Sequence, residues 1–124
     1  MALLPNDKEF LNSHGYNYEV HELQNETLLV INDYQLSPTF DQEKTKVLIR
    51  IPVGYPLAPL DMFWTNPYTK LKVNGSYPPC ADYFGDSFLE GSWQRFSRHY
   101  PWKQGYSLAT HLNVVKETLV NGRG

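Results

Sequence analysis

The sequence predicts an α+β fold, in which an antiparallel β-meander is flanked by a short N-terminal helix and a C-terminal amphipathic helix. Three strand-like segments follow one another at hairpin spacing between residues 16 and 51, as in a meander. A segment with helical periodicity then covers residues 108–119. The length of 124 residues fits one domain whose core needs neither a metal nor a disulfide.

The N-terminal helix is expected over residues 7–14. Asn6 is a suitable N-cap, and Gly15 follows where the helix would end, because glycine readily adopts the left-handed conformation that closes many helices. From Tyr16 to Leu23, apolar and polar residues alternate. This period of two predicts a strand with one face in solvent.

The second strand is expected to be central in the sheet. Residues 27–31 are an apolar, β-prone run without alternation, which is typical of a strand covered on both faces. A turn is expected at 24–26, and residues 33–38 interrupt the pattern. Alternation returns from Lys46 to Ile51 and predicts a third strand that ends at Pro52.

The region from Pro52 to Trp102 holds seven of the nine prolines. This density predicts a stiff, loop-built region without long regular elements, in which residues 61–65 alone look like a strand. Ser107 is then expected to cap a helix with a stop at residues 121–122. The apolar positions of this helix are Leu108, Leu112, Val115 and Leu119.

The charge balance bears on the class of partner. Lys and Arg number 11 against 13 Asp and Glu, which gives a net charge of −2. Such a chain has no long-range field for phosphate backbones, so nucleic acid and anionic membranes are disfavoured. No apolar run reaches the length of a spanning helix, and residues 1–5 are too short for a signal peptide. We therefore expect a cytoplasmic protein.

Cys80 is the one cysteine of the chain, and it follows two prolines. A lone cysteine on such an extended segment is either a small buried apolar residue or a nucleophile. Of the four histidines, His99 lies in the loop-built region, and the others are expected to be structural or solvent-facing. No metal and no other cofactor is expected, because ligand spacings are missing.

The segment from Trp93 to Trp102 interleaves aromatic residues with two arginines and a histidine. Such a surface could stack nucleic-acid bases, but the net charge favours a packed loop. Ser97 and His99 are two residues apart, which is a weak signal for a catalytic pair without an orienting acid.

Several motifs also occur in a characteristic order, and they resemble the ubiquitin-conjugating (UBC) fold. The matching segments are Tyr55-Pro56-Leu57-Ala58-Pro59 for the Tyr-Pro-x-x-Pro turn, Met62-Phe63-Trp64 for the short strand that follows, Asn66-Pro67-Tyr68 in place of His-Pro-Asn, Gly75 ahead of Cys80, and Trp102 to Leu119 for the tryptophan and crossover helix.

More closely, residues 61–64 together with 93–99 and Trp102 resemble the prokaryotic ubiquitin-conjugating-enzyme-like family E. The resemblance implies one UBC-like domain over residues 1–124, with a core at about 16–120. It also implies a ubiquitin-like modifier, an activating enzyme and a target protein as partners. Members of this family are encoded in bacterial conjugation operons, some of which are linked to antiphage defence.

The resemblance further implies acyl transfer. Cys80 would accept the modifier as a thioester and pass it to an amine of the target. Asp82 would orient or deprotonate that amine. Tyr68 stands where the family has its oxyanion-stabilising asparagine, so Asn66 or Asn74 is expected to donate to the oxyanion, with Asn74 preferred.

His99 is a further catalytic candidate, and Arg98 and Trp93 are candidates for binding the modifier. Two other hypotheses stay open. The chain could be a binding module of the UBC fold without transferase activity, in which Cys80 is a packing residue. It could also be a small cysteine hydrolase that uses Cys80 and His99, although the sequence identifies no acid to orient the histidine.

Overall fold

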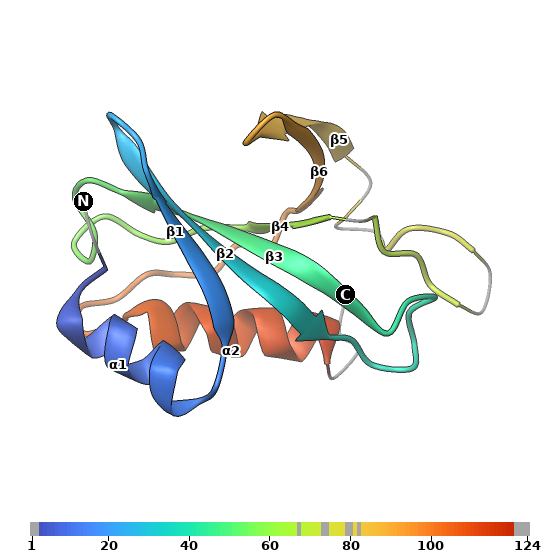
Figure 1. Cartoon of the computed structure of the whole chain (residues 1–124), viewed down its shortest axis with the longest axis horizontal. Coiled ribbons are helices and arrows are strands. Elements are labelled where there is room, and N and C mark those ends of the chain that lie inside the picture. Colours follow the sequence, from blue (N-terminus) through green and yellow to red (C-terminus); the bar gives the residue numbers. More distant parts are fainter. Residues whose placement is uncertain (1–2, 67, 73–74, 79–80, 82, 121–124) are drawn as a thin grey trace.

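The computed structural model describes residues 3–66, 68–72, 75–78, 81 and 83–120. These residues form two helices and six strands (Figure 1). The elements are α1 (Pro5–Ser13), β1 (Asn17–Glu22), β2 (Glu26–Gln35), β3 (Lys44–Pro52), β4 (Phe63–Asn66), β5 (Tyr83–Phe88), β6 (Gly91–Phe96) and α2 (Leu108–Leu119). The α+β class expected from the sequence is confirmed.

The six strands form one antiparallel sheet in the order β1-β2-β3-β4-β6-β5. The expected meander is confirmed and continues into β4. The β5–β6 hairpin then extends the sheet, with β6 beside β4. The prediction of loops throughout the proline-rich region is wrong for residues 83–96, because no proline falls between positions 80 and 100.

The two faces of the sheet are covered by different elements. Both helices lie on one face, where Leu11 of α1 and four apolar residues of α2 join the main core (Figure 1). The β5–β6 hairpin curls over the opposite face, where Trp93 packs with Trp64 and Leu28. Residues 27–31 of β2 are therefore all buried, as their unbroken apolar pattern predicts.

Some boundaries differ from the sequence expectations. Helix α1 begins at Pro5 with Leu4 as N-cap, so the expectation that Asn6 caps it is wrong; proline at a first helical position is pre-shaped for the helix. Strand β2 continues through Asp33, which has a φ of 54° at a register shift. The α2 helix follows Ser107 as predicted. Its expected stop at residues 121–122 lies outside the described residues.

The tip of the β5–β6 hairpin is built from unusual residues. Leu89 and Glu90 have φ values of 51° and 64°, and Phe88 pairs with Gly91 across them. A two-residue turn of this left-handed type normally carries Asn-Gly. The sequence signal for a hairpin was therefore missing at this turn.

Within the part of the chain that the structure describes, neither helix has the length and apolar character needed to cross a membrane.

Candidate functional site

The residues assigned to acyl transfer fall mainly outside the described residues, which do not include Asn74, Cys80 and Asp82. The described neighbours of Cys80 are Pro78 and Ala81, and both are buried. The backbone N–H of Ala81 donates to Pro78 O at 2.9 Å. Pro78 and Ala81, on the two sides of Cys80, are thus linked by a backbone hydrogen bond, and both are packed within the protein.

An aromatic cluster holds the two ends of the same stretch together. The rings of Tyr77 and Phe84 lie 4.6 Å apart, and Phe84 also contacts the ring of Tyr68 at 4.7 Å. We call residues 77–84 the Cys80 segment. Its described ends meet through this ring contact, which adds to the backbone bond between Pro78 and Ala81.

The side chain of Gln94 in β6 anchors this segment to the sheet. Its Oε1 accepts hydrogen bonds from Thr69 N (2.7 Å), Thr69 Oγ1 (3.2 Å) and Thr65 Oγ1 (3.1 Å). Its Nε2 donates to Ala81 O (2.8 Å) and Thr69 O (3.1 Å). The residue is fully buried, so each of these bonds that is broken leaves a polar group unsatisfied at a cost of about 1–3 kcal/mol.

The residues considered for the oxyanion role have structural partners of their own. Asn66 donates from Nδ2 to Ser92 O at 3.1 Å and so ties β4 to β6. The ring of Tyr68 lies in the aromatic cluster, and its carbonyl accepts from Gln42 Nε2. Neither contact supplies a donor to an oxyanion. Asn74, the preferred candidate, stays a prediction.

His99 has an acidic partner that the sequence did not identify. Its Nδ1 lies 2.9 Å and 3.1 Å from the two carboxylate oxygens of Asp61. A carboxylate accepts hydrogen bonds, so Nδ1 carries the proton and Nε2 is the acceptor of the neutral ring. Both side chains are largely exposed, at 63% and 45%. The pair is therefore an imidazole held in one orientation at the exposed surface.

The backbone beneath this pair is held in a strained conformation. Met62, next to Asp61, has a φ of 58°. Its N–H donates to Arg98 O at 3.2 Å, and its carbonyl accepts from His111 Nε2 at 2.8 Å. Left-handed backbone at a residue other than glycine costs of order 1 kcal/mol and is often found at functional sites.

His111 of α2 is structural, as expected. It is 1% exposed, and Tyr100 Oη lies 2.6 Å from its Nδ1. Burial lowers the pKa of His111 below its ordinary value of 6.5. The ring is therefore neutral, accepts from the Tyr100 hydroxyl and donates to the Met62 carbonyl, and in this way it fixes the loop that carries His99.

The β4–β6 ladder sets the separation between the His99 pair and the Gln94 anchor. Thr65 pairs with Gln94 and Phe63 with Phe96, and the Asp61–His99 contact continues the same two chains. The Asp61–His99 pair thus lies beyond the Phe63–Phe96 end of the ladder, and the Gln94 anchor lies at its Thr65 end.

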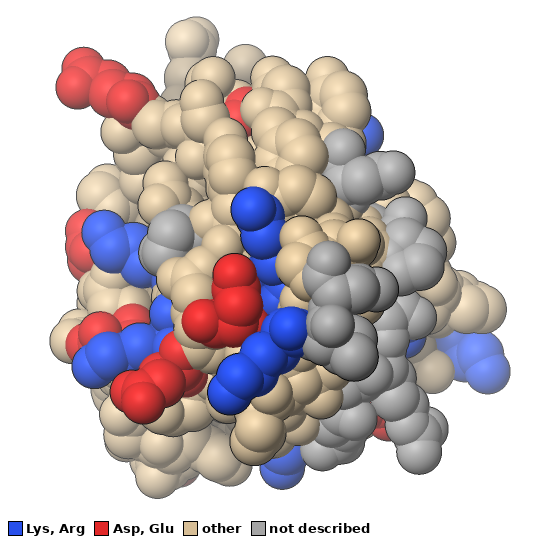
Figure 2. Space-filling view, turned by 90° about the vertical axis from the view of Figure 1, so that its right-hand side faces the viewer, with Lys and Arg blue, Asp and Glu red and all other residues tan. Residues whose placement is uncertain are grey.

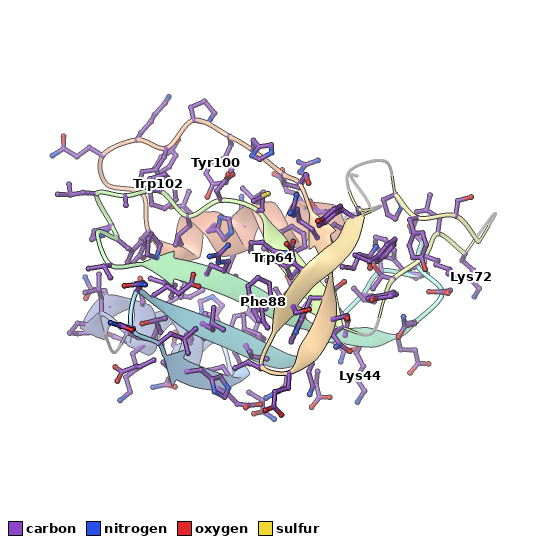
Figure 3. All side chains as sticks on the ribbon, turned by 90° about the horizontal axis from the view of Figure 1, so that it is seen from above. Lys44, Trp64, Lys72, Phe88, Tyr100 and Trp102 are labelled. Carbon is purple, nitrogen blue, oxygen red and sulfur yellow. The ribbon has the colours of Figure 1, made fainter. Side chains whose placement is uncertain are left out.

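A groove lies on the side of the molecule where the Tyr-Pro-x-x-Pro turn meets the loop before α2. Its volume is about 890 Å³, and its walls are the start of α1, residues 55–57 and residues 102–107. The indole of Trp102 donates to Pro56 O at 2.8 Å. Figure 3 shows Trp102 and Tyr100 together on the loop that leads to α2. Two motifs of the sequence resemblance therefore meet at this groove.

A buried carboxylate lies at the base of this groove. Tyr55 Oη donates to Asp7 Oδ2 at 2.7 Å and accepts from Leu108 N, the first amide of α2, at 2.7 Å. Asp7 is 4% exposed. Burial raises the pKa of Asp7 above its ordinary 3.8, although the bonds from Tyr55 and Leu108 act against that shift.

Trp93, a candidate for modifier binding, is 4% exposed and donates from Nε1 to Phe88 O at 3.0 Å. It packs beneath the hairpin, where Figure 3 shows Trp64 and Phe88 together. The expectation of a loop over residues 93–96 is wrong, since they form β6. A side chain so buried offers little surface to a modifier.

A second carboxylate joins the hairpin to the sheet. Asp86 accepts from Arg95 Nε (2.8 Å) and Nη2 (3.1 Å) and from Trp64 Nε1 (2.8 Å). The Arg95 guanidinium, assisted by the Trp64 indole, holds the pKa of Asp86 below its ordinary 3.8. Asp86 thus has a cationic partner, whereas Asp7 has none within the described part of the chain.

On one face of the molecule, the charged side chains do not gather by sign. On the face shown in Figure 2, lysine and arginine alternate with aspartate and glutamate. Across residues 3–66, 68–72, 75–78, 81 and 83–120, no three His, Cys, Asp or Glu side chains lie close enough to hold a metal ion.

Gln94, Asp61 and Asp7 are the site residues that sequence reasoning missed. Gln94 lies within the motif of residues 93–99, but no local sequence signal marks a glutamine whose hydrogen-bond partners are 13 and 25 residues away. The sequence predicts a strand at Asp61 and gives no sign that His99 lies beside it. Contacts between distant segments carry no periodicity, so they were not available from the chain pattern.

Comparison with known families gives one result. The model of a family described as prokaryotic E2 family E matches residues 3–121. No curated protein and no solved structure matches the chain.

Proposed function

This chain belongs to prokaryotic E2 family E, and on that premise we propose that it carries a ubiquitin-like protein as a thioester on Cys80 and passes it to an amine of a target protein. Family membership itself indicates an E2-like role, that of a conjugating transferase that works with a ubiquitin-like modifier and an activating enzyme. The thioester and its position are our proposal.

The observation that carries this proposal is the family match over residues 3–121 in a chain with one cysteine. An acyl carrier of this kind needs a thiol, and Cys80 is the thiol that the sequence supplies. The contacts of Pro78, Ala81 and Gln94 support the assignment, because they fix the described neighbours of Cys80 to a rigid sheet. Reactive groups are best placed by such supports.

The reaction has two acyl transfers. In the first, the thiolate of Cys80 attacks the carbonyl carbon of the modifier thioester on the activating enzyme, and the thiolate of that enzyme leaves. In the second, an amine attacks the new thioester, an amide bond forms and the Cys80 thiolate leaves. The amine loses a proton, so a nearby base accelerates this second step.

We propose two residues as candidates for the base that accepts the proton of the amine. Asp82 is close to Cys80 in sequence and would orient or deprotonate the amine. His99 is the alternative base, and its hydrogen bond to Asp61 supports the role because it leaves Nε2 as the acceptor. Asn74 remains our proposed donor to the oxyanion, and Arg98 our proposed contact for the modifier tail.

We also propose that the reaction belongs to a bacterial conjugation pathway in the cytoplasm, with antiphage defence as its setting. The UBC-like domain would cover residues 1–124, with its core at about 16–120.

The second candidate function is a UBC-fold module that binds a ubiquitin-like protein without transferring it. One observation favours it: Tyr68, at the place of the family's asparagine, is engaged in ring packing with Phe84. In that case Cys80 would be a packing residue, and no covalent adduct would form.

The cysteine hydrolase hypothesis gains one observation and meets one obstacle. Asp61 supplies the orienting acid that the sequence did not reveal. However, the Asp61–His99 pair lies beyond the Phe63–Phe96 end of the β4–β6 ladder, whereas Gln94, which holds Ala81, lies at its Thr65 end. A hydrolase would cleave simple esters in the absence of any activating enzyme.

The test of the proposed function is adduct formation. The protein is incubated with its activating enzyme, the modifier and ATP, and the products are compared with and without a reducing agent. We expect an adduct that thiols cleave. Cys80→Ser should give a more stable ester in its place, and Cys80→Ala should give no adduct. An adduct that persists in Cys80→Ala would assign the reaction to another residue, such as Ser97.

A further inference from the structure

Gln94 joins three segments that lie far apart in the sequence. Through one amide group it bonds Thr65 in β4, Thr69 beyond it, and Ala81 in the Cys80 segment. The side chain is fully buried. Such an amide serves as a structural cross-link between the β4–β6 pair and two segments that lie outside the sheet.

The orientation of this amide is determined by backbone partners. Thr69 N can only donate, so the atom 2.7 Å away must be the oxygen Oε1. The carbonyls of Thr69 and Ala81 can only accept, so they must face the two hydrogens of Nε2. Both hydrogens are used, and rotation of the amide would break all three of these contacts.

The hydrogen bond from Gln94 to Ala81 bears on the chemistry, because it holds the residue next to the thiol. Ala81 follows Cys80 directly, and its carbonyl is held at 2.8 Å from Nε2. The N–H of the same residue is held by Pro78 at 2.9 Å. Both polar atoms of the Ala81 backbone are therefore fixed, and one of them is fixed by a side chain from the sheet.

We propose that Gln94 is a positioning residue for the thiol of Cys80, and that its hydrogen bond to Ala81 O sets where that thiol stands for acyl transfer. This inference rests on the proposed function of Cys80 as the carrier. Acyl transfer depends steeply on the alignment of the attacking and leaving atoms, so a shift of about 1 Å can change the rate a hundredfold.

A purely structural role predicts a different result. If Gln94 merely fills the core, its replacement lowers stability, but the molecules that remain folded react at the normal rate. A matched control is available in Thr65→Val, which removes one donor to Oε1 and leaves the Ala81 bond untouched.

The experiment compares wild type, Gln94→Met and Thr65→Val at matched folded fraction. Each protein is charged with the modifier, and its discharge onto free lysine is timed. Hydrogen exchange is measured in peptides that cover residues 77–84. We expect Gln94→Met to slow discharge at least tenfold and to raise exchange at least tenfold, whereas Thr65→Val stays within twofold for both. Equal effects of the two variants, or normal discharge in folded Gln94→Met, would overturn the proposal.

Gln94→Glu gives a signature that packing loss cannot produce. The protonated acid can still donate to one carbonyl, but the ionised acid donates to none and faces two carbonyl oxygens. A buried carboxyl titrates above its usual range. Discharge by Gln94→Glu should therefore fall as this group ionises, in a step that is missing from the pH profiles of wild type and Thr65→Val. Identical profiles for all three proteins count against the proposal. This variant also serves if Gln94→Met fails to fold.

A failure of the proposed function would be recognised separately. If the wild-type protein takes up no modifier, the thiol is tested directly with iodoacetamide, from which the thiolate displaces iodide. We expect the alkylation of Cys80 in Gln94→Met to approach that of an unconstrained thiol, with a midpoint near pH 8.5, and to differ from wild type in rate at least fivefold. If wild type and Gln94→Met are alkylated at equal rates and with equal pH midpoints, the positioning role of Gln94 is overturned, whether or not the protein takes up a modifier.

Discussion

Two carboxylates hold different joints of this molecule together, and their surroundings shift their pKa values in opposite directions. Asp7 of α1 lies against the start of α2, where it accepts from the Tyr55 hydroxyl and has no cationic partner among the residues that the structure describes. Asp86 lies between the hairpin and the sheet, where it pairs with Arg95 and the Trp64 indole. Burial raises the pKa of Asp7, and Arg95 lowers the pKa of Asp86.

The opposite pKa shifts of Asp7 and Asp86 show that the two joints use the carboxyl group in different ways. The α1–α2 joint uses Asp7 as a hydrogen-bond acceptor at the N-terminus of a helix, and its negative charge is tolerated at a cost because water is excluded. The hairpin joint depends on the negative charge of Asp86, which attracts the Arg95 guanidinium. The first joint should therefore be strongest with a protonated acid, and the second with an ionised one.

The largest effect is expected at the hairpin joint. Asp86→Ala removes the partner of Arg95 and of the Trp64 indole together. We expect a loss of about 2–3 kcal/mol in the free energy of unfolding, since charged, partly buried hydrogen bonds are of this size. Urea denaturation at pH 7 measures it. Asp86→Asn, which keeps an acceptor for the indole, should lose less; a loss below about 0.5 kcal/mol in Asp86→Ala would show that the joint does not depend on the ion pair.

The next effect is expected at the α1–α2 joint. Tyr55→Phe removes the hydroxyl that lies between Asp7 and the first amide of α2. We expect about 2 kcal/mol of destabilisation, because a buried carboxylate and a buried amide lose their partner. Thermal and urea unfolding measure the change. Tyr106→Phe is the control, because Tyr106 lines the same groove but its hydroxyl does not bond Asp7. Comparable losses in both variants would contradict the assignment.

The pH dependence sharpens the comparison, because a group whose pKa differs between the folded and unfolded states makes the free energy of unfolding depend on pH. Because the pKa of Asp7 is raised in the folded state, its contribution to stability is complete below 3.8 and is lost as the pH rises through the folded value. The stability of Asp7→Asn relative to wild type should therefore increase as the pH rises above 3.8.

Asp86 should behave in the opposite way. Its folded pKa lies below 3.8, so its contribution is present above that value and is lost as the pH falls through the folded value. The deficit of Asp86→Asn against wild type should thus shrink in acid. Unfolding curves at several pH values test both variants, and parallel curves for Asp7→Asn and Asp86→Asn would refute the distinction between the joints.

The smallest effect tests a region that belongs to neither joint. Glu90 has a φ of 64° at the hairpin tip, and glycine adopts this conformation without a Cβ clash. Glu90→Gly should stabilise the protein by about 0.5–1 kcal/mol. Leu89→Ala keeps a Cβ on a residue with a similar positive φ, so this variant should not be more stable than wild type. A rise in melting temperature in the glycine variant alone is the expected result, and no rise would mean that the tip is unstrained.

Local patterns determined much of the fold. The alternation over residues 16–23 and 46–51, and the apolar run over 27–31, gave three strands that the structure confirms. The helical period after Ser107 gave α2. These predictions succeeded because side-chain periodicity reports which face of an element is buried. The β5–β6 hairpin was missed because its turn, Leu89-Glu90, lacks the residues that normally signal it.

The site depended more on tertiary structure. The sequence by itself determined the α+β class, the single thiol at position 80, and motifs whose order resembles the family that residues 3–121 match. The folded chain alone decided that Gln94 holds Ala81, that Asp61 orients His99 and that Asp7 meets Tyr55, across separations of 13, 38 and 48 residues. Periodicity is local and records burial, whereas the partner of a polar group is chosen by whichever distant segment the packing of the sheet and helices brings within 3 Å.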